Sequence, residues 1–370
     1  MAVAVAMLAA GVVEAQDPPP GPAAKAAPPA NNPKGKMSRK GGLRTPGREP
    51  VKGVRKAVDP LANPGGVDAA AKGAVAPLPP SGTFRYRFKV ATGEGMEPLA
   101  LTYYPSKLGN AAPVVMLVHE RDRSSKDFVD ETLAELKGLT LPESLQKQGY
   151  AVLAVDLRGH GANPRRNLSK AEWATVPGDL QAAYQCLVDR HNWGELNVAK
   201  LGVVALGEGA NVAAAWAAGG GGVSSEGRTG DVNALVLISP VVEAPSPGLN
   251  ARPTLTTLAA RVPIDLMVGE RDAASFDLVD DRRPERSIRP VLKRYRTNQV
   301  ETFPSALHGY QLFRLEPRLT ASIARFLEGT IKAKSDEWEG RYLLAPVTYT
   351  EVKVVPNPVR IDPATKKASQ

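Results

Sequence analysis

The chain has 370 residues, of which 43% are hydrophobic, and carries a formal net charge of +9. This is enough apolar material for one sizeable folded core. The single cysteine, Cys186, excludes an intrachain disulfide, and its helix-like surroundings predict a buried structural thiol. With four histidines, none of them grouped with other ligands at metal-binding spacing, and no glycine-rich nucleotide loop, the sequence predicts no metal or other cofactor.

The first fifteen residues predict a signal peptide. Residues 2–13 are apolar throughout, and Val13 and Ala15 place small residues at the −3 and −1 positions of a cleavage site. A run of this length is too short to span a bilayer, and no later segment is long and apolar enough to do so. We therefore expect an exported protein, periplasmic, envelope-associated or secreted, with no transmembrane span in the mature chain.

Residues 16–81 predict a disordered, basic, proline-rich linker. Residues 17–80 contain 14 prolines and carry 11 Lys or Arg against 4 Asp or Glu, whereas the rest of the chain carries 36 and 34. Such a segment buries too little apolar surface to offset its conformational entropy. The basic charge belongs to this linker, which suits a spacer or contact with anionic envelope polymers. Scattered basic residues without interleaved aromatics do not predict specific nucleic-acid binding.

From residue 82 the pattern becomes that of a folded domain, which we expect over residues 82–333. Two strands, at residues 83–90 and 99–104, come first. Short, continuous apolar runs then predict strands at residues 113–119, 150–156, 201–205, 234–239 and 263–268, with a weaker one at 299–303. Helical patterns separate them at residues 143–148, 177–191, 209–218 and 315–331.

This alternation predicts an α/β fold. Apolar runs without polar alternation are typical of strands buried on both faces, so we expect a mostly parallel sheet with helices on both sides. The first two strands form an antiparallel lead-in. Residues 334–370 form a C-terminal extension, in which residues 341–355 predict a strand or hairpin.

Four motifs in this order resemble the α/β-hydrolase superfamily, over residues 82–333. Val114–Glu120 (VVMLVHE) looks like its third strand, with a His-Glu pair similar to the dienelactone-hydrolase branch. Gln148–Gly161 (QGYAVLAVDLRGHG) looks like its fourth strand and turn. Val268–Asp272 (VGERD) resembles the loop of the catalytic acid, and Leu307–Tyr310 (LHGY) the loop of the catalytic histidine. The resemblance implies an esterase-like fold with a nucleophile–acid–histidine order.

The resemblance places the acid at Asp272 and the base at His308, but it leaves the nucleophile position without a nucleophile. The strand-to-helix elbow reads Ala205-Leu206-Gly207-Glu208-Gly209, and the central residue, Gly207, has no hydroxyl, thiol or carboxylate. Glycine tolerates the positive φ of such an elbow, so the turn can persist without the chemistry. We therefore predict a degenerate nucleophile position at Gly207.

Alternatives remain at this site. A register shift by one makes Glu208 the nucleophile, although it puts bulky Leu206 where a small residue is required. Glu120, Arg121 and Glu208 are predicted to line the oxyanion hole or pocket. Ser124 and Ser125 favour helix N-caps or loop contacts, and Ser239 favours a structural role.

Three functions are consistent with this pattern. The first is an exported pseudo-hydrolase that binds a small-molecule or ester ligand, or a partner, in the inherited crevice. The second is an active ester or peptide hydrolase that uses Glu208, an activated water or an unrecognised serine with His308 and Asp272. In the third, the basic linker binds polyanions and the folded domain is passive.

Overall fold

The computed structural model describes residues 84–92, 97–222, 230–341 and 347–357. All of these residues belong to one compact unit within Lys56–Gln370. The predicted signal peptide and linker lie outside the described residues, as do residues 342–346 of the predicted C-terminal strand or hairpin.

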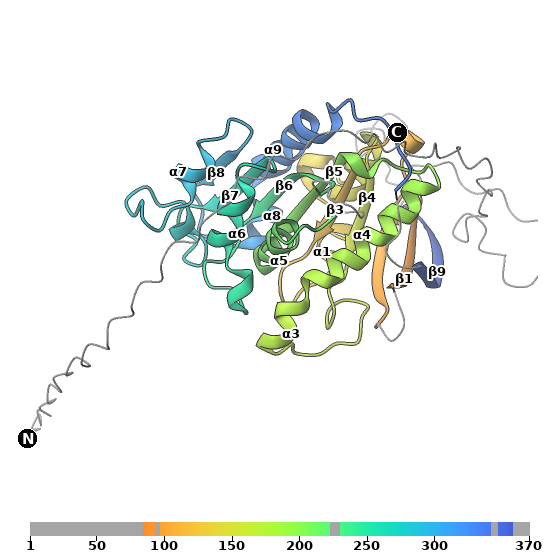
Figure 1. Cartoon of the computed structure of the whole chain (residues 1–370), viewed down its shortest axis with the longest axis horizontal. Coiled ribbons are helices and arrows are strands. Elements are labelled where there is room, and N and C mark those ends of the chain that lie inside the picture. Colours follow the sequence, from red (N-terminus) through yellow and green to blue (C-terminus); the bar gives the residue numbers. More distant parts are fainter. Residues whose placement is uncertain (1–83, 93–96, 223–229, 342–346, 358–370) are drawn as a thin grey trace, which may run out of the picture. The chain divides into compact units, whose positions relative to one another are not determined.

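A nine-stranded sheet forms the centre of the domain (Figure 1). The strand order is β8-β7-β6-β5-β3-β4-β2-β1-β9. The pairs from β4 through β3, β5, β6 and β7 to β8 are parallel, and the pairs β2–β4, β1–β2 and β1–β9 are antiparallel. The strands are β1 Phe84–Thr92, β2 Leu99–Tyr104, β3 Val114–Val118, β4 Ala151–Val155, β5 Leu201–Leu206, β6 Val232–Ile238, β7 Ile264–Gly269, β8 Gln299–Phe303 and β9 Val347–Pro356.

Helices cover both faces of this sheet (Figure 1). They are α1 Lys126–Val129, α2 Leu141–Lys147, α3 Lys170–Thr175, α4 Pro177–Asn192, α5 Gly207–Ala218, α6 Ala251–Leu258, α7 Arg289–Leu292, α8 Gly309–Leu315 and α9 Pro317–Leu327. Helix α4 has proline at its first position, as predicted. Helix α2 begins with a capping box, in which Thr140 and Glu143 bond each other's backbone N–H groups.

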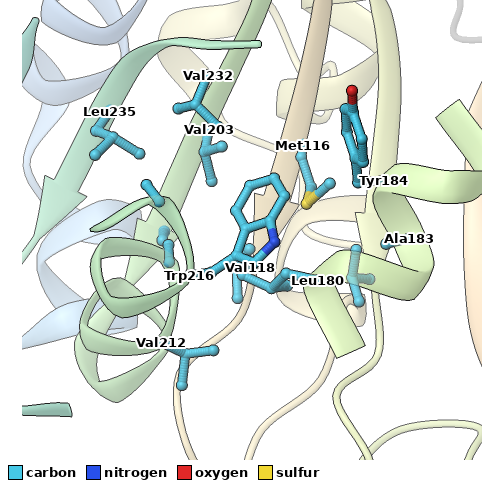
Figure 2. Packing of buried hydrophobic residues seen from close by; sticks show 14 of the residues in the cluster. Met116, Val118, Leu180, Ala183, Tyr184, Val203, Val212, Trp216, Val232 and Leu235 are labelled. Atoms are coloured by element: carbon cyan, nitrogen blue, oxygen red, sulfur yellow. The ribbon is translucent and has the colours of Figure 1, made fainter. Parts of the chain in front are cut away.

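The side chains of each central strand divide between two hydrophobic cores. On β3, Val114, Met116 and Val118 face one core, whereas Val115 and Leu117 face the other. The first core packs the sheet against α4, α5 and α6; Figure 2 shows its centre, where the strand residues meet α4 and α5. The second core packs it against α2, α8 and α9. Because both faces are buried, the strands need apolar residues at every position, which explains the continuous runs.

The helix predicted at residues 315–331 has the wrong first residue. Two helices occupy this part of the chain, because Glu316 is extended before Pro317, and α8 therefore ends before α9 begins. A π-helical turn, Glu328–Lys332, follows α9. The predicted buried thiol is confirmed: Cys186 lies buried in α4, and burial raises its pKa to about 12.

The C-terminal extension contributes a strand to the sheet. β9 pairs antiparallel with β1 from Phe84↔Pro356 to Thr92↔Val347, and so becomes the edge strand. From β9, Tyr349 donates a hydrogen bond to Asp189 at 2.6 Å and lies against the guanidinium of the fully buried Arg190. Among the described residues, no helix is both long and apolar enough to cross a bilayer.

Candidate active site

The turn between β5 and α5 has the geometry of a nucleophile elbow, with glycine at its tip. Leu206 is extended and buried, and Gly207 follows with φ +51° as the first residue of α5. A positive φ at this residue costs a side-chain-bearing residue about 1–2 kcal/mol, whereas glycine adopts it freely. The elbow is therefore in the register predicted from the sequence, with Glu208 one position into the helix.

Gly209, two residues further on, allows α5 to start against the end of β3. A Cβ atom added to it would overlap the backbone carbonyl of His119. Because the neighbour is backbone rather than a flexible side chain, it cannot move aside cheaply. The small residue at this position of the elbow thus has a packing reason that is independent of catalysis.

His308 and Asp272 meet at the carboxyl ends of β7 and β8. His308 Nδ1 donates to Asp272 Oδ2 at 2.8 Å, and Asp272 is 3% exposed. Gly269 makes this approach possible, because a Cβ there would lie 2.8 Å from the carbonyl oxygen of Ser305 and 2.9 Å from that of Leu307. With its Nδ1–H bonded to the carboxylate, the neutral imidazole exposes its Nε2 lone pair to the crevice.

The Glu120 side chain, from the loop after β3, occupies the space that a nucleophile would need. A Cβ on Gly207 would lie 2.5 Å from Glu120 Cγ and 2.9 Å from its carboxyl carbon. Glu120 Oε1 lies 3.7 Å from His308 Nε2, the atom that would face a nucleophile's hydroxyl. The carboxylate of Glu120 therefore occupies the space where the superfamily pattern places a serine hydroxyl.

A second glycine helps to hold this carboxylate. Glu120 Oε2 accepts a hydrogen bond from the backbone N–H of Tyr310 at 2.8 Å. Gly309, with φ +46°, precedes that amide, and a Cβ on it would overlap Glu120 Oε2. Gly207 and Gly309 thus leave a slot for the carboxylate of Glu120 between them.

The charges in this slot are coupled. Burial raises the pKa of Glu120, against the hydrogen bond from Tyr310 and the nearby His308, which lower it. Burial lowers the pKa of His308, but the hydrogen bond and charge of Asp272, followed by the charges of Glu120 and Glu208, outweigh that effect and raise it overall. An imidazolium at His308 would be the natural counter-charge for these carboxylates.

Glu208 lies in the first turn of α5, where a carboxylate interacts favourably with the positive end of the helix dipole. Its carboxylate also comes close to the other two groups: one ligand atom each of Glu120, Glu208 and His308 lie within 4.8 Å of one another. The structure therefore brings together Gly207, Glu208, Glu120, Asp272 and His308, five of the six residues predicted for the site.

Arg121 is the exception. Its guanidinium pairs with Asp122 at 3.5 Å and lies 5.8 Å from the ring centre of Trp173. Its side chain is 44% exposed, and no contact with Gly207, Glu208 or His308 is found for it among the described residues.

The predicted hydroxyl roles are only partly matched. Ser125 stands at the N-cap position of α1 without a side-chain cap hydrogen bond, and its backbone N–H donates to Asp156 Oδ1, which is the loop contact of the two predicted roles. Ser239 is fully buried after β6 with φ +50°, and no hydrogen-bond partner for its Oγ is found among the described residues.

The remaining histidines make backbone contacts. His119 accepts from the N–H of Leu157 through Nε2, so its Nδ1–H donates to the carbonyl of Glu120, and burial lowers its pKa to about 4. His160 contacts the carbonyl of Arg158, and His191 contacts that of Leu196.

A cavity of about 360 Å³ lies at the same edge of the sheet, between the loops after β3 and β4. Its lining is polar and includes Arg123, Lys126, Arg165 and Arg166. This volume falls within the range of small-molecule pockets.

The position of Glu120 inside the elbow could not be predicted from local spacing. Glu120, Gly207 and Gly309 are far apart in the sequence: Glu120 and Gly207 meet because β3 and β5 are neighbours in the sheet, and Gly309 reaches them on the loop after β8. One signal was available: glycine stands both at the nucleophile position and directly after the predicted catalytic histidine.

The strand order, the positive-φ elbow and the His308–Asp272 pair are those of an α/β-hydrolase fold. Residues 138–289 match a family described as serine aminopeptidase, S33. This match contains Gly207, Glu208 and Asp272, and it contains neither Glu120 nor His308. The comparison with curated proteins gave no match.

Solved structures with a similar fold are esterases and peptidases. An esterase from Pyrococcus furiosus is 18% identical, with a TM-score of 0.48 over 70% of this chain and 95% of that one. An esterase from the fungus Rhizomucor miehei is 17% identical, with a TM-score of 0.48 over 68% and 85%. The acylaminoacyl peptidase of Pyrococcus horikoshii is 13% identical, with a TM-score of 0.49 over 70% of this chain and 43% of the peptidase. At these identities the likenesses say nothing of this chain's reaction or substrate.

Proposed function

We propose that this protein is an exported pseudo-hydrolase, which binds a ligand or partner in the inherited crevice and does not form an acyl-enzyme. The observation that carries the proposal is the occupancy of the elbow: Gly207 supplies no nucleophile, and Glu120 fills the space above it. An empty elbow would need only one substitution to regain a serine, whereas this one holds a bonded carboxylate.

The arrangement lacks what serine-hydrolase chemistry requires. In that chemistry the histidine accepts the proton of a hydroxyl that attacks the carbonyl carbon, and backbone N–H groups stabilise the oxyanion. Here His308 Nε2 faces a carboxylate, which has no proton to give when ionised. Two negative side chains, Glu120 and Glu208, would also oppose an oxyanion formed beside them.

The test is turnover together with covalent labelling. We expect the purified chain to release no product from p-nitrophenyl acetate, p-nitrophenyl butyrate or aminoacyl anilides above the level of its His308→Ala variant. A fluorophosphonate probe, which labels activated serines, should leave the protein unmodified in mass spectrometry. Probe labelling of any serine, with turnover lost in His308→Ala, would refute the proposal.

Restoring the nucleophile tests the physical reason. Gly207→Ser alone should remain inactive, because the new Cβ meets Glu120. The double variant Gly207→Ser with Glu120→Gly removes the obstruction and should be labelled by the probe. A matched control is Gly207→Ser with Glu270→Gln, which changes an exposed carboxylate on the loop after β7. Equal labelling of single and double variants would contradict the role given to Glu120.

A second candidate function is hydrolysis by an activated water. The 3.7 Å separation of Glu120 Oε1 from His308 Nε2 favours it, because a water bonded to both could lose a proton to one of them while attacking a carbonyl. Its signature is turnover without probe labelling, lost in both Glu120→Gln and His308→Ala and retained in Glu270→Gln.

Export is tested separately, by fractionating cells that express the full chain and sequencing the mature N-terminus. Cleavage after Ala15 supports the signal peptide. An uncleaved chain in the cytoplasmic fraction refutes export and leaves the proposal about the crevice intact.

A further inference from the structure

Three potential metal ligands converge above Gly207. One carboxylate oxygen each of Glu120 and Glu208 and a ring nitrogen of His308 lie within 4.8 Å of one another, and each residue is partly buried. In a tetrahedral zinc site with bonds of about 2.0–2.2 Å, neighbouring ligand atoms lie about 3.4 Å apart. The 3.7 Å between Glu120 Oε1 and His308 Nε2 is already close to this separation. The ligand atom of Glu208 would have to move closer to these two atoms by about 1.4 Å at most, which a side-chain rotation can supply.

The groups behind two of these ligands orient them. The Nδ1–H of His308 donates to Asp272, which leaves Nε2 as the free donor atom and fixes the plane of the ring. The Tyr310 N–H holds Glu120 Oε2, which leaves Oε1 directed at His308. Carboxylate–histidine–metal arrangements of this kind are the usual support of imidazole ligands in metal sites.

The charge of the crevice also favours a cation. Glu120, Glu208 and Asp272 surround the single imidazole of His308. Within the described ranges, no arginine or lysine forms an ion pair with Glu120 or Glu208. Arg123 also acts electrostatically on Glu120, but its guanidinium is paired with Asp127, so a divalent ion would add positive charge to a group of three carboxylates.

We propose that Glu120, Glu208 and His308 bind one divalent first-row transition-metal ion, for which Zn²⁺ is the probe. Imidazole and carboxylate ligands together suit this class of ion. Three protein ligands leave a further coordination position, through which a carboxylate, carbonyl or water of a bound partner can attach. This inference rests on the proposed function, because it names the ligand of a crevice that has lost its nucleophile.

The experiment measures Zn²⁺ binding to the tag-free full chain, freed of metal with EDTA, by titration calorimetry. Co²⁺ serves as a spectroscopic probe, since its visible absorption reports the ligand number. We expect one Zn²⁺ per chain and affinity at least tenfold lower in both Glu208→Gln and His308→Gln. Asp272→Asn should lower the affinity 10–100-fold, as expected for a group that orients a ligand. Glu270→Gln is the matched control and should bind like the wild type.

Thermal unfolding of each variant without metal shows whether it is folded. If His308→Gln unfolds, Glu208→Gln carries the test, because Glu208 is a partly exposed helix residue whose change to glutamine preserves its shape. Zn²⁺ binding that is absent in the wild type, or equal in the wild type and Glu208→Gln, overturns the site.

Activity assays with and without Zn²⁺ separate this inference from the proposed function. Binding without turnover supports both. No binding and no turnover refutes the cation site and leaves the pseudo-hydrolase. Ester hydrolysis that appears only with Zn²⁺ and requires Glu208 supports the cation site and refutes the pseudo-hydrolase.

Discussion

The two halves of the crevice differ in how closely they follow the α/β-hydrolase pattern. The acid–histidine half, formed by the loops after β7 and β8, has Asp272 bonded to His308 at 2.8 Å. The elbow half, formed by β5, α5 and the loop after β3, has the backbone of a nucleophile elbow but holds a carboxylate from another strand at its centre.

This difference separates the parts of the site that packing maintains from those that only chemistry maintains. Gly209 is needed for α5 to pack on β3, and Gly269 for the β7 and β8 loops to approach. Neither requirement involves a substrate. At position 207 the backbone needs only a residue that tolerates the positive φ, and the space a side chain would fill there is taken by Glu120.

The largest effect is expected for Gly209→Ala. Its new Cβ would overlap the backbone carbonyl of His119, so the start of α5 must shift. We expect a loss of about 4 kcal/mol in the free energy of unfolding, measured with a chemical denaturant. Gly329→Ala, where nothing lies within 4 Å of the added Cβ, is the control and should be neutral or stabilising. A similar, small change in both would show that packing does not maintain the elbow.

The next effect is expected for Gly207→Ala, at about 2–3 kcal/mol of destabilisation. It combines the cost of a positive φ with the contact to Glu120 Cγ at 2.5 Å. The contact, but not the φ cost, should vanish in a Glu120→Ala background. A double-mutant cycle checks this, and purely additive free energies would mean that Glu120 does not occupy the nucleophile space.

Asp272→Asn tests the acid–histidine half of the crevice through the pKa of His308. Asp272 is the main cause that raises this pKa against burial, so the variant's imidazole should titrate at a lower pH in NMR of the metal-free protein. Because the pKa of His308 is higher in the folded state, its protonation stabilises the fold fully at pH values below the unfolded-state pKa of about 6.5. This stabilisation is lost as the pH rises through the folded-state pKa. The variant should therefore be about 2 kcal/mol less stable at pH 6, and the deficit should shrink by pH 9. A deficit that grows with pH would contradict the assigned hydrogen bond.

The smallest effect is expected for Asp265, a second buried aspartate, which lies on β7 just before the loop of Asp272. Unlike Asp272, it has no hydrogen-bond partner among the described residues, and burial raises its pKa to about 7. The folded state therefore tolerates the protonated Asp265 below its unfolded-state pKa near 4, and it loses stability as the pH rises through 7 and the buried carboxyl ionises. Asp265→Val should thus stabilise the protein by about 1 kcal/mol at pH 8 and by less at pH 5. Thermal unfolding at both pH values checks this, and a gain that is larger at pH 5 would refute it.

The sheet could be predicted from the sequence because its strands are buried on both faces. Each apolar run from residue 113 to residue 268 became a strand of the central sheet, within a few residues at its ends. The helices α1, α3, α6, α7 and α8, of four to eight residues, were missed, since such short segments carry too little periodicity. The helix at residues 315–331 was misplaced because its apolar pattern continues across Pro317, where the backbone cannot.

The site could be predicted only at residues whose position follows from a single local motif. Asp272, His308 and the positive φ of Gly207 each follow from a local motif, and each lies where the resemblance implied. The position of Glu120 between Gly207 and Gly309 depends instead on contacts between loops of different strands. No spacing along the chain reports such contacts, so the trio with Glu208 and His308 emerges only in three dimensions.

The pairing of β9 with β1 has a consequence for the order of folding. Phe84 and Pro356 are partners, so the first strand of the sheet waits for nearly the whole domain to be synthesised before its outer edge is covered. Contacts between such distant residues form slowly, because a long loop must close first. We expect a nascent chain that stops short of Val347 to expose the free edge of β1.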